Sequence, residues 1–212
     1  MGRAIAIANQ KGGVGKSTTA INLSSCLGAM GQKVLTIDLD PQGNTTSGLG
    51  VEKDAAENTV YELLLGECEV EECLQKLEFE GVSLIPSNVN LAGAEIELIG
   101  IEDKEYILQN KISKIRDQFD FIIIDCPPLG LVIDAAIIGH QSDGAIIVVE
   151  AGKTKYRLVQ NVKDQLENSG VSVLGVVLNK VERKNQKGYY NKYYGSQKYE
   201  GYYGHNEETK NA

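Results

Sequence analysis

The chain has no tryptophan, only three phenylalanines and only four cysteines among its 212 residues. The cysteines, at positions 26, 68, 73 and 126, follow no zinc-ligand spacing, and two of them lie inside apolar runs typical of helices or strands. We therefore expect reduced thiols, with neither a zinc centre nor a disulfide framework. No apolar run reaches the roughly 18 residues of a membrane-spanning helix, and no signal-peptide pattern is found. These absences predict a cytoplasmic protein without a transmembrane segment.

The net charge of -8 is unevenly distributed. Residues 1–150 contain 10 lysines and arginines against 23 aspartates and glutamates, whereas residues 151–203 contain 10 against 4. The acidic body argues against non-specific nucleic-acid binding over the whole surface. The basic last third has two interpretations: a contact surface for an acidic partner, DNA or a membrane, or a solvated tail.

The pattern of apolar residues predicts an α/β fold with one core. Short, β-branched runs typical of strands buried on both faces occur at residues 4–9, 33–38, 82–87, 121–126, 144–151 and 171–179. Amphipathic stretches typical of helices occur between them, at residues 17–31, 61–77, 104–118 and 156–170. This alternation predicts a doubly wound, mostly parallel sheet with helices on both faces, and a ligand site at the carboxyl ends of the strands.

The first predicted strand leads into "KGGVGKSTT", a glycine-rich turn followed by a helix. Such a turn directs backbone amides and the positive end of a helix at phosphate oxygens, with Lys16 reaching the β- and γ-phosphates and the Ser17 hydroxyl suited to Mg²⁺. The sequence therefore predicts a nucleotide-binding P-loop formed by Gly12, Gly13, Val14, Gly15, Lys16, Ser17 and Thr18.

Carboxylates follow two other predicted strands. Asp38 and Asp40 occur in "DLDPQGNTT", and alternate residues of a strand point to one face, here towards the phosphates, where they can orient a nucleophile. A turn cap before Pro41 is the alternative role for Asp40. Asp125 follows four apolar residues in "FIIIDC", which is the pattern of a carboxylate that holds Mg²⁺ together with Ser17.

The loop contains a further lysine, Lys11, at its start. This residue resembles the signature lysine of the deviant Walker A ATPases, the superfamily of ParA, MinD and the bacterial tyrosine kinases. This resemblance implies that Lys11 reaches the nucleotide of a partner subunit, in a homodimer with ATP at its interface. It also implies that Asn179, in "VVLNKV", reads the adenine edge, whereas an asparagine at a strand end is otherwise a turn residue.

Two parts of the chain resemble different branches of this superfamily. Residues 1–128 resemble the ParA or Soj chromosome-partitioning ATPases in "IANQKGGVGKSTTAINL", "LTIDLDPQGNTTSGLG", "TVYELLLGE" and "IPSNVNLAGAEIEL". Residues 121–204 resemble a bacterial tyrosine kinase of the capsular polysaccharide type in "DCPPLGLVIDAAIIGHQSDGAIIVVEAGKTKYRLVQ" and "LGVVLNKV". The two resemblances overlap only at the strand that ends in Asp125.

Seven of the ten tyrosines lie in "GYYNKYYGSQKYEGYYG", residues 188–204. Their doublets, separated by glycines and charged residues, fit neither helical nor strand spacing, so we expect an ATPase domain at 1–183 and an exposed, disordered tail at 184–212. In the tyrosine kinases such a tail is the autophosphorylation target, and its alternative here is a low-complexity tail without that chemistry. The candidate phosphorylation sites are Tyr189, Tyr190, Tyr193, Tyr194, Tyr199, Tyr202 and Tyr203.

Three functions are consistent with these patterns. The first is a ParA-like ATPase that hydrolyses ATP slowly with Mg²⁺ and dimerises with ATP, in which Lys11 and Lys16 neutralise phosphate charge and Asp38 and Asp40 position the attacking group. Its expected partners are a ParB-like protein or DNA, and its expected location is the cytoplasm or the nucleoid. The second is a tyrosine autokinase with a membrane activator protein at the inner membrane face. The third is a nucleotide-bound scaffold without turnover.

Overall fold

The computed structural model describes residues 2–78, 80–128 and 142–182. The chain divides into one unit over residues 1–180 and a second over 181–212, of which only Val181 and Glu182 are described. The seven tyrosines predicted as phosphorylation sites lie outside the described residues. The strands and helices of the described ranges all belong to the first unit.

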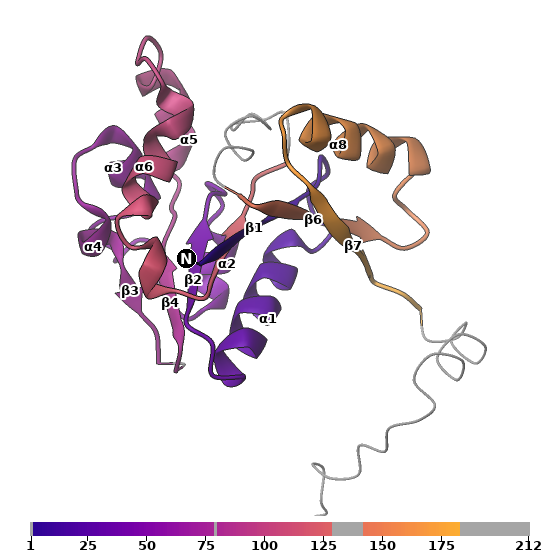
Figure 1. Cartoon of the computed structure of the whole chain (residues 1–212), viewed down its shortest axis with the longest axis horizontal. Coiled ribbons are helices and arrows are strands. Elements are labelled where there is room, and N and C mark those ends of the chain that lie inside the picture. Colours follow the sequence, from indigo (N-terminus) through magenta and orange to yellow (C-terminus); the bar gives the residue numbers. More distant parts are fainter. Residues whose placement is uncertain (1, 79, 129–141, 183–212) are drawn as a thin grey trace, which may run out of the picture. The chain divides into compact units, whose positions relative to one another are not determined.

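A sheet of seven strands forms the centre of this unit in the described residues (Figure 1). Its strands are β1 (Arg3–Ala8), β2 (Val34–Asp38), β3 (Gln75–Lys76), β4 (Val82–Ile85), β5 (Phe121–Asp125), β6 (Gly144–Glu150) and β7 (Val173–Asn179). Their spatial order is β3-β4-β2-β5-β1-β6-β7. All pairs are parallel except β3 with β4, so the predicted, mostly parallel sheet is confirmed.

Helices lie on both faces of the sheet, as predicted. They are α1 (Lys16–Ala29), α2 (Asn44–Gly48), α3 (Val60–Leu65), α4 (Val70–Cys73), α5 (Leu91–Glu97), α6 (Ile107–Ser113) and α8 (Tyr156–Asn168), with single 3₁₀ turns η1 (Lys104–Tyr106) and η2 (Arg116–Gln118). Figure 1 shows α1 and α8 on opposite sides of the strands. No helix in the described ranges is both long and apolar enough to cross a membrane.

Alternate residues of the strands face two separate cores, because successive strand side chains point to opposite faces. In β1, Ala4 and Ala6 belong to the larger core, which α3, α4, α5, α6 and α8 cover, while Ile7 belongs to the smaller core beneath α1. Each fully buried aliphatic side chain such as Ile7 contributes roughly 1.5–3 kcal/mol. Burial on both faces explains why these strands read as nearly continuous apolar runs.

The helix predicted over residues 61–77 is wrong in extent. Helix α3 ends at Leu65, and its C-cap residue Gly66 adopts a left-handed φ of 76°. A new start follows at Glu69, whose backbone N–H donates to the Glu72 carboxylate at 2.7 Å in a capping box before α4. The stretch predicted as a helix over 104–118 likewise divides into η1, α6 and η2. Local glycine and capping signals therefore override the longer amphipathic pattern.

Candidate functional site

The loop over residues 9–15 connects β1 to α1 and has the backbone that anion binding requires. Gly13 has a φ of 73° and Gly15 a φ of 102°, conformations that side chains with a Cβ rarely adopt. A Cβ on Gly15 would also collide with the side-chain amide of Asn179. Because α1 begins at Lys16, the free amides of its first turn lie directly after this loop. The structure thus has the predicted strand-loop-helix arrangement.

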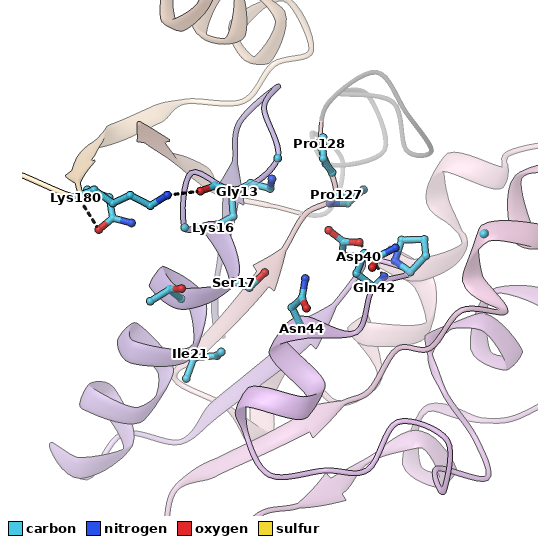
Figure 2. Close-up of a pocket in the computed structure, with 16 residues that line it drawn as sticks. Gly13, Lys16, Ser17, Ile21, Asp40, Gln42, Asn44, Pro127, Pro128 and Lys180 are labelled. Carbon is cyan, nitrogen blue, oxygen red and sulfur yellow. Dashed lines mark hydrogen bonds between the residues drawn. The ribbon is translucent and has the colours of Figure 1, made fainter. Parts of the chain in front are cut away.

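A cavity of about 730 Å³ opens beside this loop (Figure 2). Its wall comes from the loop and the start of α1, the segment after β2, Pro127 and Pro128 after β5, and the end of β7. The sequence-predicted residues that line it are Gly12, Gly13, Gly15, Lys16, Ser17, Thr18, Asp40 and Asn179. Val14 is buried in the smaller core, so only its backbone is available to a ligand.

Lys16 is the buried cation of the cavity. Its residue is 6% exposed, and its ammonium group donates to the Lys11 carbonyl oxygen at 3.3 Å. Burial lowers the pKa of Lys16, while the carboxylates of Asp125 and Asp40 raise it. A buried ammonium that faces a polar cavity is stabilised by an anionic ligand. Lys11, in the same loop, is by contrast exposed.

Asp125 is fully buried at the end of β5. Its Oδ2 accepts from the Thr45 hydroxyl at 2.7 Å, whereas its Oδ1 has no hydrogen-bond partner among the described residues. Burial raises the pKa of Asp125 to about 7, with repulsion from Asp38 adding to the shift and the hydroxyls of Thr45 and Ser17 opposing it. The Lys16 ammonium group lowers the pKa of Asp125 only in part, so an ionised carboxylate in this position would be stabilised further by a bound cation.

The donor set around Asp125 fits a hard divalent cation. The Asp125 carboxylate lies next to the Ser17 hydroxyl, which also lines the cavity. Oxygen donors of this kind are the ligands that Mg²⁺ prefers, together with water and phosphate. No group of three or more His, Cys, Asp or Glu side chains in the described ranges is arranged around a metal. A Mg²⁺ ion here would need phosphate or water as further ligands.

Asp38 and Asp40 differ sharply in environment. Asp38 is fully buried, and its Oδ2 accepts from both the backbone N–H and the hydroxyl of Thr46 at 2.8 Å. Its Oδ1 accepts from the Asp40 backbone N–H at 3.1 Å. Asp40 lines the cavity, and its own carboxylate accepts from the Gln42 backbone N–H at 2.9 Å. Asp38 thus holds the segment that carries Asp40, and a direct catalytic part for either stays a prediction.

Asn179 lies at the cavity with both ends of its amide engaged. Its Nδ2 donates to the Val14 carbonyl oxygen at 2.9 Å, and its Oδ1 accepts from the Lys180 backbone N–H at 2.9 Å. These bonds tie the end of β7 to the P-loop. The expected contact with adenine stays a prediction.

Four further residues take part in the site and were not predicted. Thr45 and Thr46 bond the two aspartates, and Lys180 donates to the Gly13 carbonyl oxygen at 2.8 Å. Asn9 is buried after β1, where its side-chain amide donates to the Val148 carbonyl oxygen and its Oδ1 accepts from the Lys11 backbone N–H at 3.1 Å. The threonine pair in "GNTT" was a local signal, because hydroxyls that follow a phosphate-facing loop are suited to bonding its carboxylates.

Comparison with known proteins gives one family for nearly the whole first unit. Residues 2–181 match the AAA_31 family, described as an AAA domain. This range includes most of the part that resembles the tyrosine kinases in sequence, up to residue 181, so a single ATPase family accounts for it.

Curated relatives agree with this match. The chain is 38% identical to the sporulation initiation inhibitor protein Soj of Bacillus subtilis, over 89% of this chain and 76% of Soj. It is also 38% identical to the chromosome partitioning protein ParA of Caulobacter vibrioides, over 86% and 71%. An uncharacterized protein of Pseudomonas putida is 44% identical over 79% of this chain, which spans only 62% of that relative's length.

Solved structures share the fold. A cobyrinic acid a,c-diamide synthase from Mycobacterium smegmatis, with bound ATP analog and magnesium, has a TM-score of 0.72 and 33% identity over 84% of this chain and 72% of its own. The cell division ATPase MinD of Pyrococcus furiosus has a TM-score of 0.72 and 32% identity over 87% and 75%. The chain therefore belongs to the AAA_31 family, within the ParA/MinD superfamily of P-loop ATPases.

Proposed function

We propose that this chain binds ATP with Mg²⁺, hydrolyses it slowly and uses it to switch between a monomer and a dimer. One observation carries the proposal: the buried Lys16 ammonium and the unpartnered Asp125 oxygen lie at the same end of the sheet. The first needs an anion and the second a cation, and Mg²⁺ on a triphosphate supplies both. Crystals of relatives with an ATP analog or ADP and magnesium support this choice.

Each residue of the site has a part in this proposal. The loop amides and Lys16 bind the phosphates, and Ser17 and Asp125 hold the Mg²⁺, which when bound neutralises charge on the phosphate oxygens. Asp40, which lines the cavity, orients the attacking water, and Asp38 positions Asp40 through its backbone bond. Most of the rate enhancement comes from positioning and charge stabilisation rather than covalent chemistry.

Lys11 supports the dimer in this proposal. It is exposed on the loop, while the carbonyl oxygen of the same residue accepts from Lys16. The loop backbone is therefore held at Lys11, while the exposed side chain of the same residue reaches the phosphates of a second copy. Turnover is slow because the charge stabilisation is complete only in the dimer.

The decisive experiment combines binding, sedimentation and phosphate release. Lys16→Ala should abolish ATP binding, whereas Lys11→Ala should bind ATP and stay monomeric in analytical ultracentrifugation. Lys33 is an exposed lysine directly before β2, so Lys33→Ala is the control and should behave as wild type. Unchanged ATP affinity in Lys16→Ala would refute the site, and an ATP-dependent dimer of Lys11→Ala would refute the switch.

The tyrosine cluster of residues 189–203 raises a second function to test, which is tyrosine autophosphorylation. Wild-type protein incubated with γ-labelled ATP and Mg²⁺ should release free phosphate and leave the protein unlabelled. Label on the tyrosines of residues 189–203 would favour the autokinase and a membrane activator as its partner, and neither product would favour the scaffold. A ParB-like protein or DNA, the partners expected of a partition ATPase, should increase phosphate release.

A further inference from the structure

Two carbonyl groups of the P-loop are bonded by side chains from the end of β7. The Gly13 carbonyl oxygen accepts from the Lys180 ammonium at 2.8 Å, and the Val14 carbonyl oxygen accepts from the Asn179 amide at 2.9 Å. Figure 2 shows the Lys180 side chain extended to Gly13. In a planar trans peptide group the N–H points opposite to the C=O, so a bond that fixes a carbonyl group also fixes the direction of the N–H of the next residue. These two bonds therefore bear directly on how the loop presents its amides.

The backbone at Lys180 is strained in a way that serves this contact. Its φ of 57° is left-handed, and in the described residues Asp103 is the only other non-glycine residue with a positive φ. Such conformations persist where the surrounding structure fixes them, and they cluster at functional sites. Here the Asn179 side-chain oxygen accepts from the Lys180 backbone N–H at 2.9 Å and holds the turn. The turn directs the lysine back to the loop.

The same ammonium group is anchored by a carboxylate from the next strand. Glu150, at the end of β6, lies 3.3 Å from the Lys180 nitrogen and 2.7 Å from that of Lys153. The Lys180 side chain is 50% exposed and that of Lys153 is 72% exposed, but in the described residues only the Lys180 ammonium group is also bonded to the P-loop. Lys180 thus joins β6, β7 and the P-loop, while Lys153 binds the same carboxylate from the solvent side. This difference makes Lys153 a matched control.

We propose that Lys180 is a positioning residue for phosphate binding, which fixes the P-loop by holding the Gly13 carbonyl group and thereby the direction of the next backbone N–H. This inference rests on the proposed ATP site and adds a residue to it. Lys180 acts through the loop and not through the base, because its ammonium group is engaged by Gly13 and Glu150 and the Asn179 amide is engaged by Val14. The effect should therefore extend to a phosphate ligand that has no base at all.

The test measures the affinities of ATP and of inorganic triphosphate, both with Mg²⁺, by calorimetry. Lys180→Ala should weaken both ligands about tenfold, which is the scale of one lost charge-assisted hydrogen bond. Lys180→Arg should restore most of the affinity, because a guanidinium can donate to both Gly13 and Glu150. Lys153→Ala should stay within about twofold of wild type, since it loses only an exposed ion pair.

Three results would overturn the inference. Loss of ATP affinity with unchanged triphosphate affinity would place Lys180 at the base, and equal behaviour of Lys180→Ala and Lys153→Ala would remove its special part. Binding of neither ligand by the wild type would refute the proposed function and this inference with it. Thermal unfolding without ligand checks that the variants fold; if Lys180→Ala does not, Glu150→Gln replaces it, and unchanged triphosphate affinity there would contradict the inference.

Discussion

Strands β2 and β5 are neighbours in the sheet, and each ends in a buried aspartate. Asp38 and Asp125 are register partners, and both are fully buried. Asp38 accepts three hydrogen bonds, from Thr46 and Asp40, whereas Asp125 accepts one from Thr45 and leaves Oδ1 without a partner in the described part of the chain. In this pair, hydrogen-bond saturation and not position at a strand end separates the structural carboxylate from the one that can still accept a bond from a ligand.

Electrostatics sharpens this contrast. Burial is the largest cause that raises the pKa of both carboxyl groups. The bonds from Thr46 and Asp40 lower the pKa of Asp38 in opposition, and repulsion from Asp38 raises that of Asp125 further. The carboxylate of Asp125 is therefore the one that gains most from a bound cation.

The largest effect should come from Asp125→Asn. Removing the charge that holds Mg²⁺ should lower the rate of ATP hydrolysis by about 100-fold or more, the scale seen when a group that stabilises transition-state charge is lost. The free energy of unfolding should stay the same or rise, because a buried charge with an unpartnered oxygen is removed. Phosphate release and urea unfolding measure the two quantities. Hydrolysis within threefold of wild type would contradict the metal assignment.

Asp38→Asn should give the opposite pattern. An amide cannot accept all three of the hydrogen bonds made to Asp38, so the free energy of unfolding should fall by about 2 kcal/mol. Hydrolysis should fall less than in Asp125→Asn, because Asp38 acts by holding Asp40. Urea unfolding of both variants checks this reversal. If Asp38→Asn is as stable as wild type and loses more activity than Asp125→Asn, the two parts have been assigned the wrong way round.

The sequence predicted most of the fold because buried parallel strands produce continuous apolar runs. The predicted strands at residues 4–9, 33–38 and 121–126 match β1, β2 and β5 to within about two residues. Short elements such as α2 and α5 were missed, because five or seven residues give too little periodicity to recognise.

The site divides in the same manner between local and long-range signals. The P-loop, Asp40 and Asp125 can be recognised in the sequence, since each lies at the end of a strand or within a few residues after it. The hydrogen bonds that determine the roles of these residues cannot be recognised in the sequence, because Thr45 is 80 residues from Asp125 and Lys180 is 167 residues from Gly13. Only the folded sheet brings these partners together.

Thr45 and Thr46 allow a second comparison of Asp125 with Asp38, because each threonine bonds one of the two aspartates. The Thr46 hydroxyl donates to Asp38 at 2.8 Å and accepts from the Ser87 backbone N–H at 2.9 Å, whereas the Thr45 hydroxyl makes the single bond to Asp125. Thr46→Val should therefore destabilise the protein more than Thr45→Val, by about 1 kcal/mol, the worth of one hydrogen bond. Thr45→Val should instead weaken Mg²⁺-dependent ATP binding by several-fold. Equal stabilities in urea unfolding would count against a saturated Asp38.

The smallest effect is expected at Ser87, at the outer edge of the Asp38 network. Its backbone N–H bonds Thr46, but its hydroxyl is buried and has no hydrogen-bond partner among the described residues. Ser87→Ala keeps the backbone bond and removes an unsatisfied polar atom, so the free energy of unfolding should rise by up to about 1 kcal/mol. Urea unfolding of Ser87→Ala and Thr46→Val, measured in parallel, gives this change in the free energy of unfolding. A loss of stability would show that the hydroxyl is bonded, and that the network around Asp38 extends beyond Thr46.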